Sequence, residues 1–213
     1  MSRPDLYRNV HMGQRAHLFT LAVDVGAADA RRPDTVARLA RRCLDMVQEL
    51  REHADHEDTY IHPLLRARAP GAADAMDAEH GRLETTLSVL NERARQLAER
   101  PAAPVLDEQH ALYLAINELI SAYLAHLHAE ETIAMPALWG RCSDEELFAV
   151  LHEFRSSRTS DERLDDLRKM LPALPPTVRA AIVQAALASG VEGEAERTLT
   201  ALCGALTPQH SVR

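Results

Sequence analysis

Apolar side chains recur every four and three residues over four long stretches of this chain. The stretches cover residues 5–27, 34–68, 72–99 and 105–139, and Gly or Pro residues lie at or beside each break between them. Alternating steps of four and three give each helix one apolar stripe, and this alternation is typical of left-handed packing between long helices. Short loops favour antiparallel neighbours. The pattern therefore predicts an all-α protein built as an antiparallel up-down-up-down four-helix bundle.

The character of the sequence changes after Gly140. Ser143 and Glu146 predict a capping box at the start of a shorter helix, and other short helical patterns follow it. These helices are expected at residues 143–156, 160–171, 176–188 and 193–205. No cluster of potential ligands occurs in this part of the sequence. We therefore divide the chain into a bundle domain, residues 1–140, and a C-terminal helical extension, residues 141–213, expected to cover the bundle or contact another subunit.

Two of the long stretches contain the same series of His, Glu, Thr, Pro and Leu in one register. The series occupies residues 53–65 and again residues 126–138. In each copy a Glu follows a His by four residues, and side chains at this spacing lie one above the other on a helix. Two such faces turned toward each other would form a cage of imidazole and carboxylate, which suits a hard or borderline metal ion.

Each copy also contains a Pro within its helical pattern. Pro63 and Pro136 lack the backbone N–H that a helix interior needs, so each is expected to kink its helix or restart it. An unbroken helical period continues the apolar stripes through both sites. On that basis the stripe residues are expected to be Tyr60, Leu64, Ile133 and Ala137.

Ionisable side chains interrupt the apolar stripes at related positions. They are His11, His53, Glu57, His80, His126 and Glu130. An ionisable group on a core stripe costs free energy unless it is paired or binds a metal ion. One buried His is usually a satisfied core residue, and a His–Glu hydrogen-bond network is the alternative explanation. Six such groups on four helices favour a metal site inside the bundle.

Depth along the helices distinguishes two His residues of the first stretch. With the first loop near residue 30 and a rise of about 1.5 Å per residue, His17 would miss the level of His53 by roughly 15 Å. His11 would miss it by only about 6 Å. His17 also lies off the apolar stripe. His11 is therefore the predicted ligand from the first helix.

These residues together resemble the hemerythrin-like family, also called the HHE cation-binding domain. The resemblance covers residues 5–139 and rests on His11 with Arg15, His53 with Glu57 and Pro63, Glu79 with His80, and His126 with Glu130, Glu131 and Pro136. It implies a non-haem diiron centre, in which an oxo or hydroxo group bridges two iron ions, with manganese or zinc as alternative metals. The motif match implies terminal ligands at His11, His53, His80 and His126, and bridging carboxylates at Glu57 and Glu130.

The third helix departs from the pattern of the oxygen-carrying hemerythrins. Those proteins have two His four residues apart there and five in all, whereas here Glu84 follows His80 by four residues. Glu84 lies one step off the stripe and either supplies a further metal ligand or pairs locally on the helix surface. A more anionic ligand set favours ferric iron and reactions with oxygen or peroxide over reversible oxygen storage.

Other polar residues near the six predicted ligands have more than one possible role. Tyr60 and Tyr123 could hydrogen-bond a ligand carboxylate or coordinate ferric iron, although an ordinary core role is the favoured interpretation. Asp58 and Glu79 flank the site and could orient ligand His residues from behind. The residues expected off the stripe, in solvent or behind the ligands, are His56, His62, His128 and Glu131.

Charge and cysteine content limit the partners of the protein. The formal net charge of −8 argues against nucleic acid or an anionic membrane as the main partner. Three widely spaced Cys residues without a CxxC motif are typical of a reduced protein. The N-terminus lacks the apolar core of a signal peptide, and no long apolar run predicts a membrane span. We expect a cytoplasmic protein, and its oligomeric state is not predicted.

Four functions are compatible with these features. The first, which we favour, is a diiron protein that binds or consumes a small oxidant such as dioxygen, peroxide or nitric oxide, with peroxidase or oxidase activity left open. The second is a diiron oxygenase or oxidase with an organic substrate, which needs an apolar pocket beside the metal ions. The third is an oxygen- or iron-sensing module whose C-terminal helices transmit a change. The fourth is a metal-free helical bundle.

Overall fold

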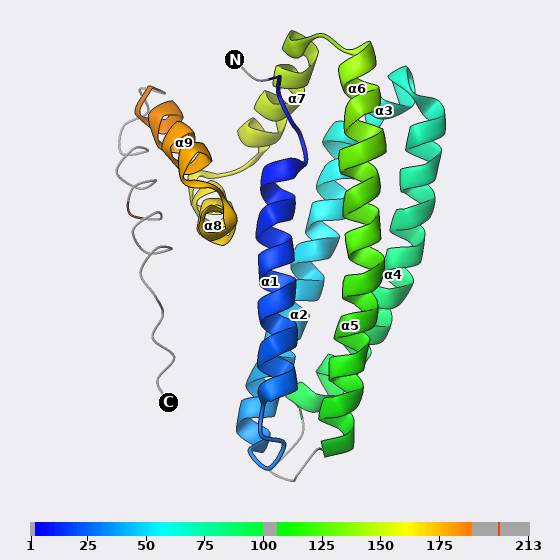
Figure 1. Ribbon diagram of the computed structural model, residues 1–213, viewed down its shortest axis with the longest axis vertical. Helices are drawn as coiled ribbons and strands as arrows, with labels where there is room; N and C mark the ends of the chain where they lie inside the picture. Colours follow the sequence, from blue (N-terminus) through cyan, green and yellow to red (C-terminus); the bar gives the residue numbers. More distant parts are fainter. Residues whose placement is uncertain (1–2, 100–105, 189–199, 201–213) are drawn as a thin grey trace.

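Four long helices lie side by side along the long axis of the molecule (Figure 1). They are α1 (Arg8–Ala27), α2 (Pro33–His56), α4 (Pro70–Ala98) and α5 (Leu106–Ala129). The computed structural model describes residues 3–99, 106–188 and 200, and all regular structure within them is helical. Helix α2 packs against α4, α4 against α5, and α1 against both α5 and α2. The prediction of an all-α protein is confirmed.

Two separate apolar clusters stabilise this arrangement. One fills the half of the long helices nearest the α1–α2 loop and includes Leu18, Leu50, Leu90 and Ile116. The other lies toward the opposite end and includes Tyr7, Leu65, Met76, Met135 and Leu138. Fully burying one such side chain contributes about 1.5–3 kcal/mol to stability. The two clusters together can therefore offset the cost of a layer of buried polar side chains between them. Five of the six ligands predicted on the stripes fall between the two clusters, and the sixth, His126, lies at the border of the first one, beside Leu127.

Each repeated segment contains one π-helical turn that begins at its Glu. These turns are η1 (Glu57–Ile61) and η2 (Glu130–Ala134), followed by the short helices α3 (His62–Arg68) and α6 (Met135–Arg141). Pro63 and Pro136 stand at the second position of α3 and α6, where a missing N–H costs little. The predicted restart of both helices is confirmed. Turns of this kind are frequent at functional sites.

The π turns also correct the apolar stripes drawn from the sequence. A π turn holds one more residue than an α turn, so every side chain after it is rotated by one position. The buried residues are therefore Ile61, Leu65, Ala134 and Leu138. The expected stripe of Tyr60, Leu64, Ile133 and Ala137 is wrong by one residue in each copy: Tyr60, Leu64 and Ala137 are half-buried, and Ile133 is 53% exposed.

Within the described residues, three further α-helices follow α6. They are α7 (Asp144–Ser157), α8 (Ser160–Met170) and α9 (Pro176–Ala188), with a 3₁₀ turn, η3 (Leu171–Ala173), after α8. The predicted capping box of Ser143 and Glu146 is confirmed, and Thr159 and Glu162 form a second one at α8. The predicted helix over 193–205 lies, apart from residue 200, outside the described residues. Among the described helices, none combines the length and apolarity that a membrane span requires.

Gly13 allows α8 to approach α1 closely. A Cβ atom at this position would lie 3.1 Å from the Cα of Met170 and 3.4 Å from the carbonyl oxygen of Lys169. Lys169 also joins α8 to α2, because its Nζ lies 3.4 Å from Oε2 of Glu49. In Figure 1, α8 and α9 accordingly stand beside α1, on its outer side. The C-terminal helices are thus fixed to the same face of the molecule as α1 and α2.

We expect Gly13→Leu to displace α8 from α1 while the four long helices stay folded. Overpacking of this kind typically costs about 1–3 kcal/mol, which corresponds to roughly 5- to 150-fold faster local opening. Amide hydrogen exchange over residues 160–170 should accelerate by that factor, with little change over residues 18–25. Gly71→Leu is the matched control, since nothing lies within 4 Å of a Cβ there. Equal exchange in both variants would contradict the contact.

Candidate metal centre

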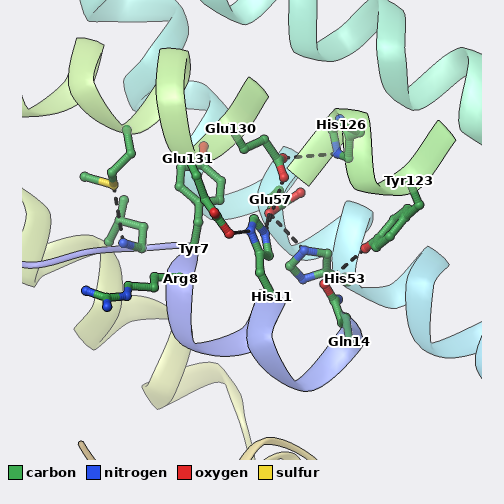
Figure 2. A network of polar contacts seen from close by, with 12 residues as sticks. Tyr7, Arg8, His11, Gln14, His53, Glu57, Tyr123, His126, Glu130 and Glu131 are labelled. Carbon is green, nitrogen blue, oxygen red and sulfur yellow. Dashed lines mark hydrogen bonds and ion pairs between the residues drawn. The ribbon is translucent and has the colours of Figure 1, made fainter. Parts of the chain in front are cut away.

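The structure brings six of the seven predicted ligands together at one level between the long helices. They form two groups, and the ligand atoms within each group all lie within 4.8 Å of one another. The first group is His11, His53, Glu57 and Glu130. The second group is Glu57, His80, His126 and Glu130. Both carboxylates therefore belong to both groups. Figure 2 labels five of the six residues, all except His80.

All six side chains are buried or nearly so. His11 and Glu130 have no exposed surface, and the most exposed of the six side chains, His53, is only 12% accessible. His53 and Glu57 belong to the end of α2 and the start of η1, with His53 Nε2 3.0 Å from Glu57 Oε1. His126 and Glu130 repeat this geometry at α5 and η2, at 3.2 Å. The two sequence repeats thus supply one His–Glu pair each.

The remaining two His residues come from the other two long helices. Nε2 of His11, on α1, lies 3.3 Å from Glu130 Oε2 and 3.7 Å from Glu57 Oε1. Nε2 of His80, on α4, lies 3.4 Å from Glu57 Oε2 and 3.9 Å from Glu130 Oε1. Every one of the four His residues therefore turns its Nε2 atom toward the same pair of carboxylates.

Outer carboxylates hold two of these His rings from behind. Nδ1 of His126 lies 3.0 Å from Glu79 Oε2, and Nδ1 of His80 lies 3.2 Å from Asp58 Oδ1. A carboxylate at Nδ1 keeps the ring proton there and leaves the Nε2 lone pair free for a metal ion. Both contacts agree with the orienting role expected for Asp58 and Glu79.

Glu131 orients His11 in the same way, which the sequence did not reveal. Its Oε1 lies 2.9 Å from Nδ1 of His11, and Arg15 donates a hydrogen bond of 2.7 Å to the same oxygen. These partners hold the pKa of Glu131 near 2, His11 having the largest effect, followed by burial in the opposite direction and by Arg15. Arg15 follows His11 by four residues, so a helical wheel of α1 places both on one side and could have suggested a shared anionic partner.

Several buried ligand atoms lack a hydrogen-bond partner among the described residues. They are Nε2 of His11, His53 and His80, and both carboxylate oxygens of Glu57 and Glu130. An unpartnered buried polar group costs about 1–3 kcal/mol, so such a set calls for something that all its atoms can share. A cation satisfies imidazole lone pairs and carboxylate oxygens together, and this donor set suits iron, manganese or zinc. The residues present therefore fit a metal centre.

The cage takes up protons when no metal ion is bound. Burial lowers the pKa of His11, but Glu131, Glu57 and Glu130 outweigh it and raise this pKa to about 9. His80 reaches a pKa of about 9 in the same way, with burial opposed mainly by Glu57. Burial, and then the charge of Glu57, raises the pKa of Glu130. Protons and metal ions thus compete for the same atoms.

Glu84 lies apart from the other six predicted ligands. Its carboxylate sits on the surface of α4, where Arg51 donates hydrogen bonds of 2.9 and 2.6 Å and Ser88 donates one of 2.8 Å. The side chain is 52% exposed and belongs to neither group. Its position one step off the apolar stripe turns it outward, which agrees with the local-pairing alternative.

The other polar residues singled out in the sequence take varied positions. His17, 33% exposed and 3.5 Å from Glu49, belongs to neither group. Tyr123 donates a hydrogen bond of 3.2 Å to Gln14, whereas the Tyr60 ring packs 5.7 Å from that of Phe154. Within the described residues, neither Tyr therefore hydrogen-bonds a ligand carboxylate.

The off-stripe His residues differ in their surroundings. His128 is exposed, and the ring of half-buried His56 packs 5.1 Å from that of Phe154. His62 is completely buried, stacked on His80 at 5.0 Å between ring centroids, with Nδ1 2.8 Å from Asp58 Oδ1. His62 therefore lies behind the ligands and not in solvent. The π turn before it explains this burial, because it rotates the later side chains by one position.

Tyr7 is a second residue beside the cage; the sequence places it on the apolar stripe of the first helix but assigns it no role. Its ring is fully buried 5.6 Å from that of His11, and its hydroxyl has no hydrogen-bond partner among the described residues (Figure 2). Burial, and then the charges of Glu57 and Glu130, raise the pKa of Tyr7 well above its usual value. The hydroxyl therefore stays protonated and can donate a hydrogen bond beside the cage.

Comparisons with known proteins agree with this geometry. Residues 4–138 match the family model of the hemerythrin HHE cation binding domain. The chain is also similar to the iron-sulfur cluster repair protein YtfE of Yersinia pestis and of Yersinia pseudotuberculosis, with 25% identity over 134 residues. That match covers 61% of this chain and 60% of the length of each relative. No solved structure matches the chain. On the family match, this chain belongs to the hemerythrin HHE cation-binding domain family.

Proposed function

We propose that this chain is a non-haem diiron protein that binds or reacts with a small oxidant: dioxygen, peroxide or nitric oxide. The observation that supports this best is the sharing of Glu57 and Glu130 between two four-residue groups, because two carboxylates common to two sites suit two neighbouring ions. We further propose that residues 1–140 form an antiparallel up-down-up-down bundle around the ions and that residues 141–213 form a helical extension of it.

The proposed ligands divide evenly between the two ions. His11 and His53 would hold one ion, His80 and His126 the other, and each carboxylate would bridge the two. Two nitrogens and two oxygens for each ion leave positions open for a small molecule, since iron accepts up to six ligands. Iron, when bound, supplies Lewis-acid and one-electron chemistry to a molecule at these positions.

The surrounding residues would prepare the site for such a molecule. The apolar clusters above and below the cage lower the local dielectric constant and so strengthen electrostatic interactions inside it. The protonated Tyr7 hydroxyl could donate a hydrogen bond to a bound oxygen atom, and Glu131 fixes the ring of His11. The Yersinia relatives are named for iron-sulfur cluster repair, which is consistent with iron chemistry in this chain.

Metal analysis tests the proposal. Protein purified without chelator, or reconstituted anaerobically with Fe(II), should contain two iron ions for each chain, one for each group of ligands. Its ferric form should have a visible absorption band that changes when peroxide is added. Protein that takes up no iron after anaerobic reconstitution would overturn the proposed function.

Metal loading should also release protons. At pH 7, below the pKa of about 9 for both His11 and His80, each ring carries a proton that a metal ion must displace. Adding Fe(II) to metal-free protein in a weakly buffered indicator solution should release about two protons per chain at pH 7. The number should fall toward zero as the pH rises above 9. Loading at pH 7 without proton release would contradict the protonation of these rings.

A further inference from the structure

A cavity of about 1020 Å³ lies between α1, α2 and η1 on one side and the C-terminal helices on the other. Helices α1 and α2 form its inner wall, and α7, α8 and α9 form its outer wall, on the side where Figure 1 shows α8 and α9 beside α1. A cavity of this size can hold a small organic molecule, because typical ligand pockets measure about 300–1,000 Å³. The C-terminal helices thus partly cover a surface of the long helices and leave a half-open space beneath them.

The inner end of the cavity reaches one half of the metal centre. His53 and Glu57 both line it, whereas His80 and His126 do not. The group formed by His11, His53, Glu57 and Glu130 therefore adjoins the cavity, and the other group adjoins it only through the shared carboxylate of Glu57. A molecule held in the cavity would lie beside one proposed metal position and away from the other.

Apolar side chains from both walls line the space. They include Val10, Ile61, Leu151, Phe154, Met170 and Ile182. The ring of Phe154 also packs against the rings of His56 and Tyr60, at 5.1 and 5.7 Å. These residues give the cavity a wall of aliphatic and aromatic groups close to the metal ligands.

The charged side chains of the lining largely neutralise one another. Lys169 Nζ lies 3.1 Å from Asp165 and 3.4 Å from Glu49. Arg158 lies 3.0 Å from Asp166 and is further paired with Glu162.

The charges of the lining disfavour an anion, and its apolar walls disfavour an ion of either sign. Acidic residues outnumber basic ones in the lining as a whole, so an anion would be repelled. Arg155 and Arg163 have no carboxylate partner among the described residues, but Glu52 and Asp161 lie in the same lining. An organic cation would lose its hydration against the apolar walls. An uncharged molecule avoids both costs.

We infer that this cavity binds an uncharged, apolar organic molecule beside the metal position of His11 and His53. The site adjoins the cage at His53 and Glu57 but extends beyond it, and it gives the C-terminal helices a function of their own. The placement of the molecule beside a metal ion rests on the proposed function, whereas its binding in the cavity does not. A ligand in this position is what the oxygenase alternative requires and what a simple oxidant-binding protein does not need.

Two fluorescent probes that share one ring system test the charge preference. N-Phenyl-naphthylamine is uncharged, and anilinonaphthalene sulfonate adds a single negative charge to the same apolar body. Titration of the full chain should show one saturable site for the uncharged probe, with binding of the sulfonate at least about tenfold weaker. Equal affinity for the two probes, or no saturable binding of the uncharged one, would overturn the inference.

Variants that fill the cavity test where the probe binds. Ile182→Trp and Val178→Trp each add a large ring to the α9 wall, far from the proposed metal ligands, and should weaken binding of the uncharged probe by about tenfold or more. Val89→Trp, at a 46% exposed position of α4, is the matched control and should leave binding unchanged. Unaltered binding in both α9 variants would place the probe elsewhere and overturn the inference.

Measurements on metal-free and iron-loaded protein separate this inference from the proposed function. Binding to metal-free protein that is lost in the α9 variants supports the cavity even if the chain takes up no iron. Iron uptake without probe binding would overturn the cavity and leave the proposed function standing. In iron-loaded protein, the uncharged probe should also shift the visible absorption of the ferric centre, and an unchanged spectrum would contradict its place beside His53.

Discussion

His11→Ala should strongly reduce the iron content of the protein, from two ions to about one per chain, whereas His17→Ala should leave the iron content unchanged. His11 is fully buried and turns Nε2 toward both carboxylates, at 3.3 Å from Glu130 and 3.7 Å from Glu57. Its loss leaves one position with a single His ligand, and it opens a polar cavity next to Glu131. Since changes even behind a ligand typically cost about 10–100-fold in metal affinity, removing the ligand itself should cost at least about 100-fold.

His17 is a demanding control because it lies on the same helix, six positions further on. Its ring is 33% exposed, and its nearest anionic partner is Glu49, at 3.5 Å, which also faces Lys169. Iron per chain should be measured after anaerobic reconstitution and removal of loosely bound metal. If His17→Ala empties the site while His11→Ala stays full, then the ligand assignment for α1 is wrong.

Glu57→Gln should abolish both metal positions, whereas Glu84→Gln should affect neither. Glu57 belongs to both ligand groups, and an amide in its place removes the negative charge and the second carboxylate oxygen from both at once. Iron content should fall from two ions to well below one per chain. Loss of a ligand used by one position only, as in His126→Ala, should have the smaller effect of removing about one ion.

Glu84→Gln makes the same chemical change on the surface of α4. Its carboxylate is held by Arg51 and Ser88, and an exposed ion pair of this kind contributes about 0–1 kcal/mol to stability. The variant should therefore keep two ions and nearly the stability of the parent chain. Loss of an ion from Glu84→Gln would restore Glu84 as a ligand, and two ions in Glu57→Gln would contradict the bridging role of Glu57.

Local patterns in the sequence predict the long helices and the six residues of the cage. The step of four and three defines α1, α2, α4 and α5, and a His–Glu pair at a spacing of four needs only one helical turn to form. Depth along an ideal helix is equally local: the six residues from His11 to His17 correspond to roughly 9 Å of rise along α1. The sequence predicts these features because each depends only on the geometry of a single helix.

The features that the sequence did not predict arise where the helix is not ideal or where distant segments meet. The π turns at Glu57 and Glu130 rotate all later side chains by one position, which buries Ile61 and His62 and leaves Tyr60 half-buried. The contact between Glu131 and His11 joins residues 120 positions apart. No periodicity within one segment indicates a contact of that kind.

The cavity beside the metal centre has the same origin. It depends on how α8 and α9 pack against α1, a packing that Gly13 allows because any larger side chain would meet Met170. The sequence showed only that short helices follow the long ones. Whether they cover the site, and what space they leave, is decided by contacts between segments that share no local pattern.

Anomalous X-ray diffraction from crystals of the iron-loaded protein, recorded on both sides of the iron absorption edge, tests the central claim most directly. The account predicts two peaks about 3.5–4 Å apart, both between Glu57 and Glu130, one beside His11 and His53 and the other beside His80 and His126. A map without an iron peak between these two carboxylates, or with iron bound only elsewhere on the chain, would contradict it.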